Sequence, residues 1–384
     1  MSLLSSSPNR RRWLQQAGWL AAGAGAGVHA WAQPARPAAG ARSPAVAQLV
    51  DFSAAQQDVS KDFLIGSRAA WQDINARGGL RGRPVTHLAL ETDGTPASLR
   101  AALDEAHANP ACVALSGSAG DLLAAQVSAL SGQGLLGMAH AAPWLQNSSV
   151  PVDDKTFPIF ATRQAQIAHA LKNLSVMGVK VLGAVYASEH EQAAHHAEVG
   201  RIAANLELRV ESFQGGANLR QLGQKLTPGT PAVLLFLGGT PELAQFTQGL
   251  DRQARQRYIV ALADVNLQTL AQMGAVRTTP VIATQPVPMA NAALPVVRQY
   301  REVLARLFDE SPTPLGLAGF IAARYTFEVM SALEGPLTRQ GVLAGFQQRA
   351  SVNVGGFRIA YDAQRRSSTY VTQSMMTPDG RLIG

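Results

Sequence analysis

The stretch DINARGGLRGRPVTHLALETDGTP, residues 73–96, joins one helix to a strand and that strand to the next helix. An apolar series at helical spacing ends at Ile74. Gly78 and Gly79 follow, where a helix C-cap needs the left-handed conformation that glycine adopts without steric cost. Residues 85–90 are mostly apolar and predict a buried strand, and the turn residues DGTP at 93–96 start the following helix. The stretch therefore predicts an α/β fold.

The alternation of strand and helix continues along the chain. Short apolar segments bounded by Gly, Pro, Asn or Asp predict strands at 45–51, 85–91, 112–116, 135–139, 158–162, 181–186, 207–213, 232–237, 258–263 and 281–285. Segments between them predict helices, for example at 98–107, 122–131, 166–177, 191–205, 241–253 and 294–308. Such alternation indicates parallel sheets covered on both faces. So many units leave two architectures open, two doubly wound lobes or one barrel.

A resemblance to a known family decides between these two architectures. The segment NARGGLRGR at 75–83, with Asp93 and Pro96, resembles the first lobe of bacterial extracytoplasmic solute-binding proteins. The subgroup is the one typified by the Leu/Ile/Val-binding proteins of ABC transporters. Further segments resemble this family in the same order, at 117–121, 134–138, 160–163, 177–186, 294–301, 319–324, 355–358, 368–371 and 379–381.

The resemblance implies the type I fold of periplasmic binding proteins, an α/β fold with two doubly wound, Rossmann-like lobes joined by a hinge. The first lobe is expected to take roughly 45–158 and 288–345, and the second roughly 159–287 and 346–384. Chain crossings at 160–163 and 285–288, which interrupt the alternation of strand and helix, set these limits.

The first 32 residues resemble an export signal. Arg10, Arg11 and Arg12 precede a weakly apolar run, and Ala30-Trp31-Ala32 offers a cleavage site with small residues. The arginines resemble a twin-arginine signal, and an ordinary secretory signal with an extra arginine is the alternative. Both predict cleavage after Ala32 and a periplasmic location, with a disordered tether at 33–44 that is rich in Pro, Ala and Gly.

Composition limits the classes of function that remain. The hydrophobic fraction of 47% suffices for two domains with cores, and the formal net charge is +7. Three of those charges belong to the signal, so the rest of the chain is too mildly basic to indicate nucleic acid binding. The single cysteine, Cys112, lies in an apolar run and is expected to be a core residue. The densest basic run, Arg252, Arg255 and Arg257, is interpreted as a solvated face.

A two-lobed binding protein holds its ligand between the lobes, in loops at the carboxyl ends of the parallel strands. This rule selects ten candidate ligand-binding residues: Ser53, Ser116, Ser118, Asp121, His140 and Ala141 in the first lobe, and Tyr186, Glu189, Thr240 and Asp264 in the second. By resemblance, amino-acid binders of the family hold the α-carboxylate with first-lobe loops and the α-ammonium with a second-lobe acid. Here Asp121 stands where the family has serine, so the residues with which the family binds amino acids are only partly present. Asp121 and Asp264 are alternatively helix N-caps.

Other chemistries have weaker support. His190 and His195 are five residues apart, about 140° around a helix, so they do not form the His-x-x-x-His pair of a zinc protease. The sequence has no nucleophile elbow or phosphate loop. Neither a cofactor nor a metal is expected.

The expected function is that of an extracytoplasmic solute-binding protein, not an enzyme. It would capture an amino acid or a related carboxylate or amide and deliver it to an ABC permease. Its expected partners are thus the solute and the permease, without nucleic acid. The alternatives are a periplasmic ligand-sensing subunit of a membrane receptor and, less favoured, an exported α/β enzyme.

Overall fold

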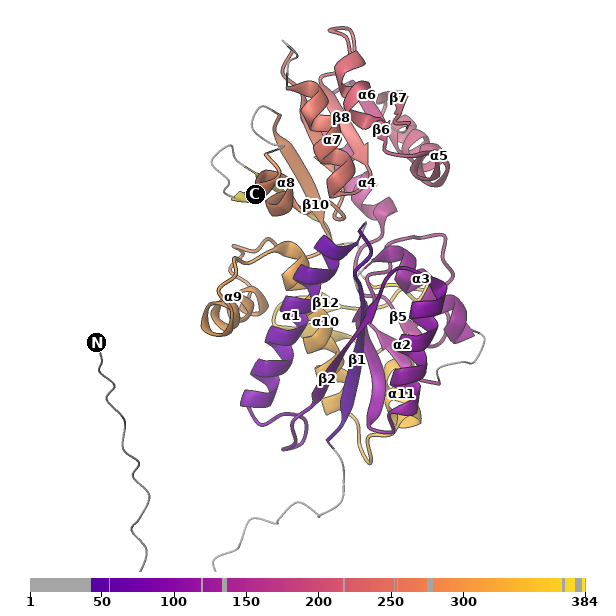
Figure 1. Ribbon diagram of the computed structural model, residues 1–384, viewed down its shortest axis with the longest axis vertical. Coiled ribbons are helices and arrows are strands. Elements are labelled where there is room, and N and C mark those ends of the chain that lie inside the picture. The colour runs from indigo at the N-terminus through magenta and orange to yellow at the C-terminus, as the bar shows by residue number, and fades with distance from the viewer. Residues whose placement is uncertain are drawn as a thin grey trace, which may run out of the picture. The chain divides into compact units, whose positions relative to one another are not determined.

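The computed structural model describes residues 43–54, 56–118, 120–132, 137–216, 218–251, 253, 255–274, 279–367, 370–376 and 382–383. The expected signal peptide at 1–32 and the tether as far as residue 42 lie outside these residues. The described chain forms two large sheets with helices on both faces (Figure 1).

The first sheet is parallel and has the strand order β2-β1-β3-β4-β5. Its strands are β1 (Ala45–Asp51), β2 (Thr86–Thr92), β3 (Cys112–Ser118), β4 (Ala139–Ala141) and β5 (Thr156–Phe157). Side chains alternate across β1: Val46 joins the core with α1 (Gln57–Ala76) and α10 (Pro314–Ser331). Ala47 and Leu49 join the core with α2 (Pro96–Ala108) and α3 (Asp121–Gly132). Both faces are therefore buried, as parallel sheets require.

The second sheet has the order β14-β13-β10-β9-β8-β6-β7. It is parallel over β6 (Val181–Tyr186), β7 (Arg209–Gln214), β8 (Val233–Leu237), β9 (Tyr258–Ala261) and β10 (Val281–Gln285). The C-terminal strands β13 (Thr372–Met376) and β14 (Leu382–Ile383) add to it antiparallel. Helices α4 (Arg163–Val176) and α5 (Glu189–Asn205) contribute to one core cluster. Helices α6 (Leu219–Lys225), α7 (Thr240–Leu250) and α8 (Leu267–Gln272) contribute to another.

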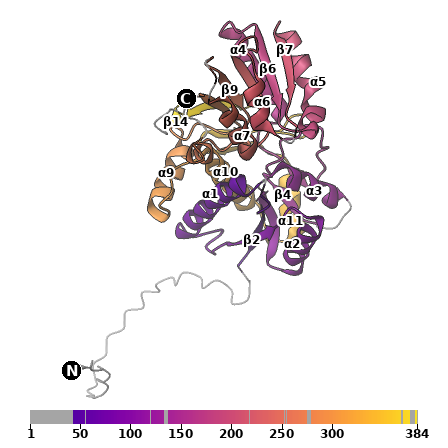
Figure 2. The ribbon, with the colours of Figure 1, turned by 45° about the horizontal axis from the view of Figure 1, so that its top comes forward.

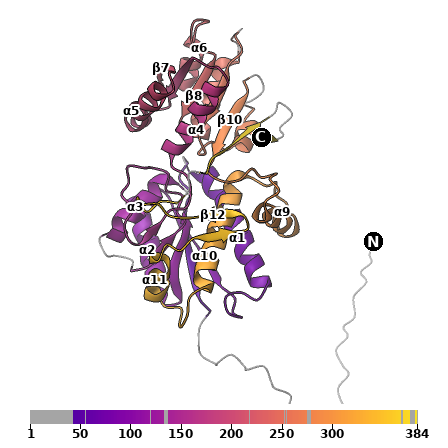
Figure 3. The same cartoon turned by 180° about the vertical axis from the view of Figure 1, so that it is seen from behind.

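The chain passes between the sheets three times, so neither lobe is contiguous in sequence. It leaves the first sheet after β5, returns after β10 and reaches the second sheet again at β13 (Figures 2 and 3). After β10 come α9 (Pro295–Leu307), α10 and α11 (Arg339–Gln347). These doubly wound lobes confirm the expected fold class and exclude the single barrel.

The hairpin of β11 (Val352–Val354) and β12 (Phe357–Ile359) bears on the limits of the lobes. Its buried side chains Val354, Phe357 and Ile359 pack in the core cluster that contains α1 and α10. The limits expected from sequence place 346–384 in the second lobe. We propose instead that the first lobe takes about 45–158 and 288–370, and the second about 159–287 and 371–384.

Residues 73–96 fold as their sequence predicts. Gly79 has φ +67° and donates its N–H to Ile74 O at 2.9 Å, which closes the C-terminus of α1. A Cβ on Gly79 would lie 2.0 Å from the backbone oxygen of Arg83, so only glycine fits. Thr95 caps α2 by accepting from Ser98 N, and Pro96 occupies the first helical position.

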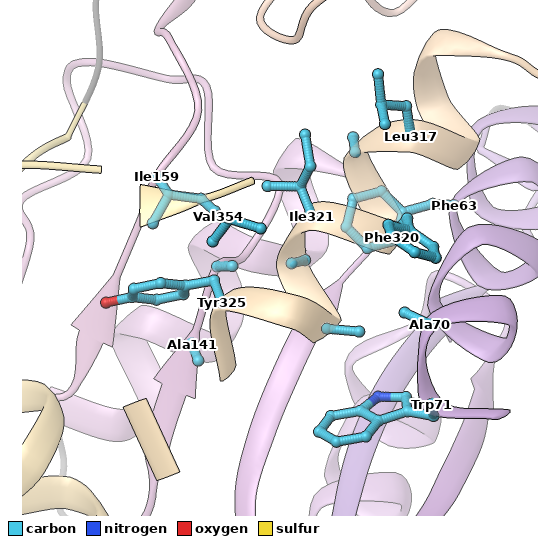
Figure 4. Packing of buried hydrophobic residues seen from close by; sticks show 14 of the residues in the cluster. Phe63, Ala70, Trp71, Ala141, Ile159, Leu317, Phe320, Ile321, Tyr325 and Val354 are labelled. Atoms are coloured by element: carbon cyan, nitrogen blue, oxygen red, sulfur yellow. The ribbon is translucent and has the colours of Figure 1, made fainter. Parts of the chain in front are cut away.

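Helices α1 and α10 pack unusually closely. A Cβ on Gly66 would lie 1.7 Å from the backbone oxygen of Gly316, and one on Gly319 would lie 1.9 Å from that of Phe63. Figure 4 shows Phe63, Ala70 and Trp71 of α1 together with Leu317, Phe320 and Ile321 of α10. The absent side chains bring the two backbones into contact and fix α1 on the first sheet.

Three sequence expectations need correction. Residues 158–162 are not a strand; the strand is β5, and Pro158, which lacks an N–H, ends the ladder. The strand expected at 135–139 is β4 at 139–141, and residues 133–136 lie outside the described residues.

The third correction concerns Arg257, which is 2% exposed and does not lie on a solvated face. It donates to the carbonyl oxygens of Thr227 and Pro231 and to Gln253 Oε1, each at 2.9 Å. Arg257 is therefore a structural residue. Arg252 lies outside the described residues, whereas Cys112 is buried in β3 as expected.

Candidate functional site

The two lobes meet where loops follow the carboxyl ends of their strands. Asn266, after β9, donates its Nδ2 to Asp62 Oδ2 on α1 at 3.0 Å. Arg163, the first residue of α4, donates its backbone N–H to Gln146 O of the loop after β4 at 3.0 Å. These hydrogen bonds join the lobes at the edges that the strand-end rule selects.

Asn266 is fixed by its own surroundings. Its Oδ1 accepts from the backbone N–H groups of Gln268 and Thr269 and caps α8, while its own N–H donates to Thr240 Oγ1 at 2.9 Å. Burial raises the pKa of Asp62, against the lowering effect of its hydrogen bonds. A cavity of about 10 Å³ beside this contact has room for about one water.

Asp264, the predicted second-lobe anchor, forms an ion pair with Arg163. The Nε and Nη2 atoms of Arg163 lie 2.9 Å and 2.7 Å from Asp264 Oδ2. The two side chains are 18% and 16% exposed, so solvent screens the pair less than a surface pair. Asp264 follows β9, two residues before Asn266, and its partner Arg163 is the residue whose backbone N–H contacts Gln146 O.

Gln166 ties the first crossing segment to the second sheet. Its Oε1 accepts from Ala263 N at 3.0 Å and from Thr284 Oγ1 at 2.9 Å, and its Nε2 donates to Ala161 O at 3.3 Å. The residue is fully buried. Its neutral amide supplies both a donor and acceptors, which a carboxylate could not.

Two first-lobe candidates, Ser118 and Asp121, adjoin the turn between β3 and α3. The hydroxyl of Ser118 is fully buried and has no hydrogen-bond partner among the described residues, and the same holds for Ser60 on α1. Ser118 O accepts from Trp144 N at 3.1 Å, which brings the loop after β4 to the same place. Asp121 is the first residue of α3, and its side chain is outside the description.

Other first-lobe candidates have interior positions. Ser116 is buried and its Oγ lies 2.7 Å from Thr326 Oγ1 of α10. His140 and Ala141 are fully buried in β4. Burial lowers the pKa of His140 to about 4, so the ring is neutral at pH 7. Ser53 is half-buried and donates its N–H to Asp51 Oδ1 at 2.8 Å.

The second-lobe candidates are distributed over three strand ends. Tyr186 is fully buried in a core cluster, where burial raises its pKa to about 12. Glu189 is exposed on the first turn of α5. Thr240 is buried and accepts from Asn266 N. Of the ten candidates, Thr240 and Asp264 lie next to the contacts between the lobes.

Sequence reasoning missed several residues that build this region. Asp62 and Gln146 make the interlobe hydrogen bonds, and Gln166 holds the crossing segment. The signal for Asp62 was an acidic residue inside the apolar series of α1, beside Phe63 and Leu64, because a carboxylate partly withdrawn from water needs partners. Within the described residues, no group of three His, Cys, Asp or Glu side chains is placed to hold a metal ion. No helix there combines the length and apolar character that crossing a bilayer requires.

Comparison with known proteins gives one family. A family model described as periplasmic binding protein matches residues 44–376. No curated protein matches the chain.

Solved structures with similar folds come from several bacteria. An extracellular ligand-binding receptor from Verminephrobacter eiseniae has a TM-score of 0.79 at 17% identity, covering 89% of this chain and 100% of the other. A substrate-binding periplasmic protein from Ralstonia solanacearum has a TM-score of 0.77 at 22% identity, covering 89% and 99%. A branched chain amino acid ABC transporter protein from Thermus thermophilus with bound valine has a TM-score of 0.73 at 13% identity, covering 90% and 95%. Because the sequence identities are this low, the similarities show a shared fold and nothing more specific.

Proposed function

Because this chain belongs to the periplasmic binding protein family, whose model matches residues 44–376, we propose that it captures a small molecule between its lobes and delivers it to an ABC permease. The observation that carries this proposal is the contact between strand-end loops of the two lobes. Asn266, which follows β9 in the second lobe, donates its Nδ2 to Asp62 Oδ2 on α1 of the first lobe at 3.0 Å. A solute bound at these edges would contact both lobes and favour their closure.

The first-lobe part of the site centres on the turn between β3 and α3. A solute carboxylate there would accept from the buried hydroxyl of Ser118 and from backbone N–H groups at the start of α3. Orphaned buried hydroxyls cost free energy unless a partner supplies the missing bond. Asp121 directly follows this turn, and Ser116 lies on β3 just before it. Thr240 and Glu189 would border the solute from the second lobe.

The family membership implies an extracytoplasmic location, and we place the protein in the periplasm. The arginines at 10–12 and the site at Ala30-Trp31-Ala32 support export with cleavage after Ala32. Mass spectrometry of the periplasmic fraction should show a chain that begins at Gln33. A chain that keeps Met1 would contradict export by this signal.

A thermal-shift screen of the mature chain tests solute capture. Amino acids, amides, aromatic acids and short dicarboxylates are the compounds to include, and one of them should raise the melting temperature in proportion to its concentration. A hit should be recovered chemically unchanged, because the proposed protein binds and does not catalyse. Turnover of the hit would support an exported enzyme instead, and uptake that does not depend on the permease would contradict delivery.

A further inference from the structure

An acidic side chain lies at the contact between the two lobes. Asp62, on α1, is half-buried, and its Oδ2 accepts from Asn266 Nδ2 of the second lobe at 3.0 Å. The side chain of Thr313, the N-cap of α10, is a second hydrogen-bond partner of the same carboxylate. Both partners are neutral, so neither cancels the negative charge that an ionised Asp62 brings into the contact.

The cavity of about 10 Å³ that adjoins Asp62 is lined by both lobes. Apolar side chains form much of its lining, with Val265 and Leu267 from the second lobe and Pro314 and Leu315 from the first. A carboxylate in such surroundings is more stable when it is protonated, because burial disfavours the charged form. Burial accordingly raises the pKa of Asp62, although its hydrogen bonds act in the opposite direction.

The charged and titratable groups of the first lobe near Asp62 do not offset this burial. Lys61 and Glu310 act on the carboxylate with opposite signs, and their side chains, 4.0 Å apart, are 66% and 49% exposed. Water therefore screens both charges. Tyr300 of α9 stays neutral, because burial raises its pKa. Asp58, one turn earlier on α1, adds a like charge.

The second lobe brings a neutral acceptor to the cavity. Gln285, at the end of β10, is 3% exposed, and its Oε1 is buried without a hydrogen-bond partner among the described residues. Gln285 lines the same cavity as Asp62, so one water can reach both side chains. The second-lobe residues that line it are all uncharged, and the nearby Asp264 is paired with Arg163 at 2.7 Å. A protonated Asp62 would supply the donor that Gln285 lacks, directly or through that water.

We propose that the lobes close with uptake of one proton by Asp62, so that the closed form becomes favoured over the open form as the pH falls, an inference that rests on the lobe closure of the function proposed above. The proton comes from solvent and binds the carboxylate, whose Oδ2 still accepts from Asn266. Opening withdraws Val265, Leu267 and Gln285, admits water to the carboxylate and releases the proton.

The direction of the pH effect follows from linkage. The pKa of Asp62 is raised in the contact and returns toward its ordinary value of 3.8 when the carboxylate is solvated. The closed form therefore binds more protons than the open form between these two values. Its added stability is fully present below pH 3.8 and is lost as the pH rises through the raised pKa. Uptake of one proton changes the ratio of closed to open molecules by at most about tenfold per pH unit.

Small-angle scattering of the mature chain without a solute tests this inference. The radius of gyration of the unaltered chain should decrease between pH 7.5 and pH 4.5, while near-ultraviolet circular dichroism checks that the chain stays folded at each pH. Asp62→Asn keeps an acceptor for Asn266 but cannot titrate. Its radius should be smaller than that of the unaltered chain at pH 7.5 and should lose most of the response to pH.

Asp104→Asn is the matched control, because it removes an exposed carboxylate from α2. This variant should respond to pH as the unaltered chain does. A radius of the unaltered chain that does not depend on pH, or an equal response in folded Asp62→Asn protein, overturns the inference. If the chain unfolds at acid pH, the comparison at pH 7.5 decides, and a radius of Asp62→Asn that is equal to or larger than that of the unaltered chain overturns it.

These measurements need no solute, so the inference and the proposed function fail separately. A pH-dependent radius that Asp62→Asn abolishes supports proton uptake on closure even if the thermal-shift screen finds no solute, a result that counts against the proposed function alone. Where the screen finds one, its affinity for the unaltered chain should rise as the pH falls and should rise less in Asp62→Asn. An equal rise in both proteins would overturn the link between closure and Asp62.

Discussion

His140 is a fully buried histidine whose protonation costs the folded state more than the unfolded state. Burial lowers its pKa from 6.5 to about 4. The folded chain therefore binds fewer protons than the unfolded chain as the pH falls below about 6.5, and stability decreases until the pH passes the folded value. The stabilisation that depends on a neutral His140 is present above pH 6.5 and is lost at acid pH.

Urea denaturation at pH 8 and pH 5 measures this dependence. His140→Leu should reduce the loss of unfolding free energy between the two pH values by about 2 kcal/mol, from the linkage between the two pKa values. His190→Leu is the control, since His190 is exposed on α5. Equal acid sensitivity in the unaltered chain and in His140→Leu would contradict this account.

Gln166 shows how one amide can hold a crossing segment. Gln166→Leu keeps the volume but leaves the buried N–H of Ala263 without its acceptor and removes the shorter of the two hydrogen bonds of the Thr284 hydroxyl. We expect a loss of roughly 2–4 kcal/mol in unfolding free energy, measured by urea denaturation. The exposed Gln248→Leu on α7 should change it by less than about 0.5 kcal/mol. Comparable losses in both variants would show that the buried amide is not the cause.

At the scale of elements, the glycines between α1 and α10 set a spacing that no other residue permits. Gly319→Ala would place a Cβ against the backbone oxygen of Phe63, which cannot move without shifting α1. Overpacking of this kind costs about 1–3 kcal/mol or more in unfolding free energy.

Gly200→Ala on α5 is the matched control for this substitution. A Cβ there meets nothing within 4 Å, so the better helix propensity of alanine should stabilise the chain by up to about 1 kcal/mol. Opposite signs of the two changes in urea denaturation are the expected result. A stabilising Gly319→Ala would mean that the helices separate at no cost.

The elements that sequence predicts are those with a local signal. The C-cap glycines and the turn at 93–96 set the limits of α1 and α2 because their conformations depend on nearby residues. The sequence of helix α10 has no amphipathic pattern, because the helix is buried on nearly all sides. Only the family resemblance at residues 319–324 drew attention to this segment. The position of Arg257 could not be predicted either, since its carbonyl partners lie about 26–30 residues away.

The candidate site was predictable at the level of strand ends but not of partners. The rule for parallel sheets selected Asp264 and the loop as far as Asn266. It could not indicate that Arg163, 101 residues earlier, neutralises the carboxylate. Tyr186 was selected as the last residue of its strand, but its side chain faces a core cluster instead of a free edge. Side-chain direction at a strand end depends on the face of the sheet, which a single sequence leaves open.

At the scale of the whole molecule, the hydrogen bond from Asn266 to Asp62 links the two lobes. Asp62→Ala removes the acceptor without touching the cap that Asn266 provides for α8. We expect the unliganded chain to open further, with a larger radius of gyration in small-angle scattering. Asp58→Ala, one turn earlier on α1, is the control. An unchanged radius in Asp62→Ala would mean that other contacts hold the lobes.

The central claim is that a solute binds between the two lobes, against the strand ends of both sheets. Hydrogen–deuterium exchange of the mature chain, with and without a saturating hit from the thermal-shift screen, tests it most directly. Exchange should be slower in two separate regions, residues 112–118 with the start of α3 in the first lobe and residues 258–267 in the second. Protection confined to one lobe, or located away from both strand-end regions, would contradict it.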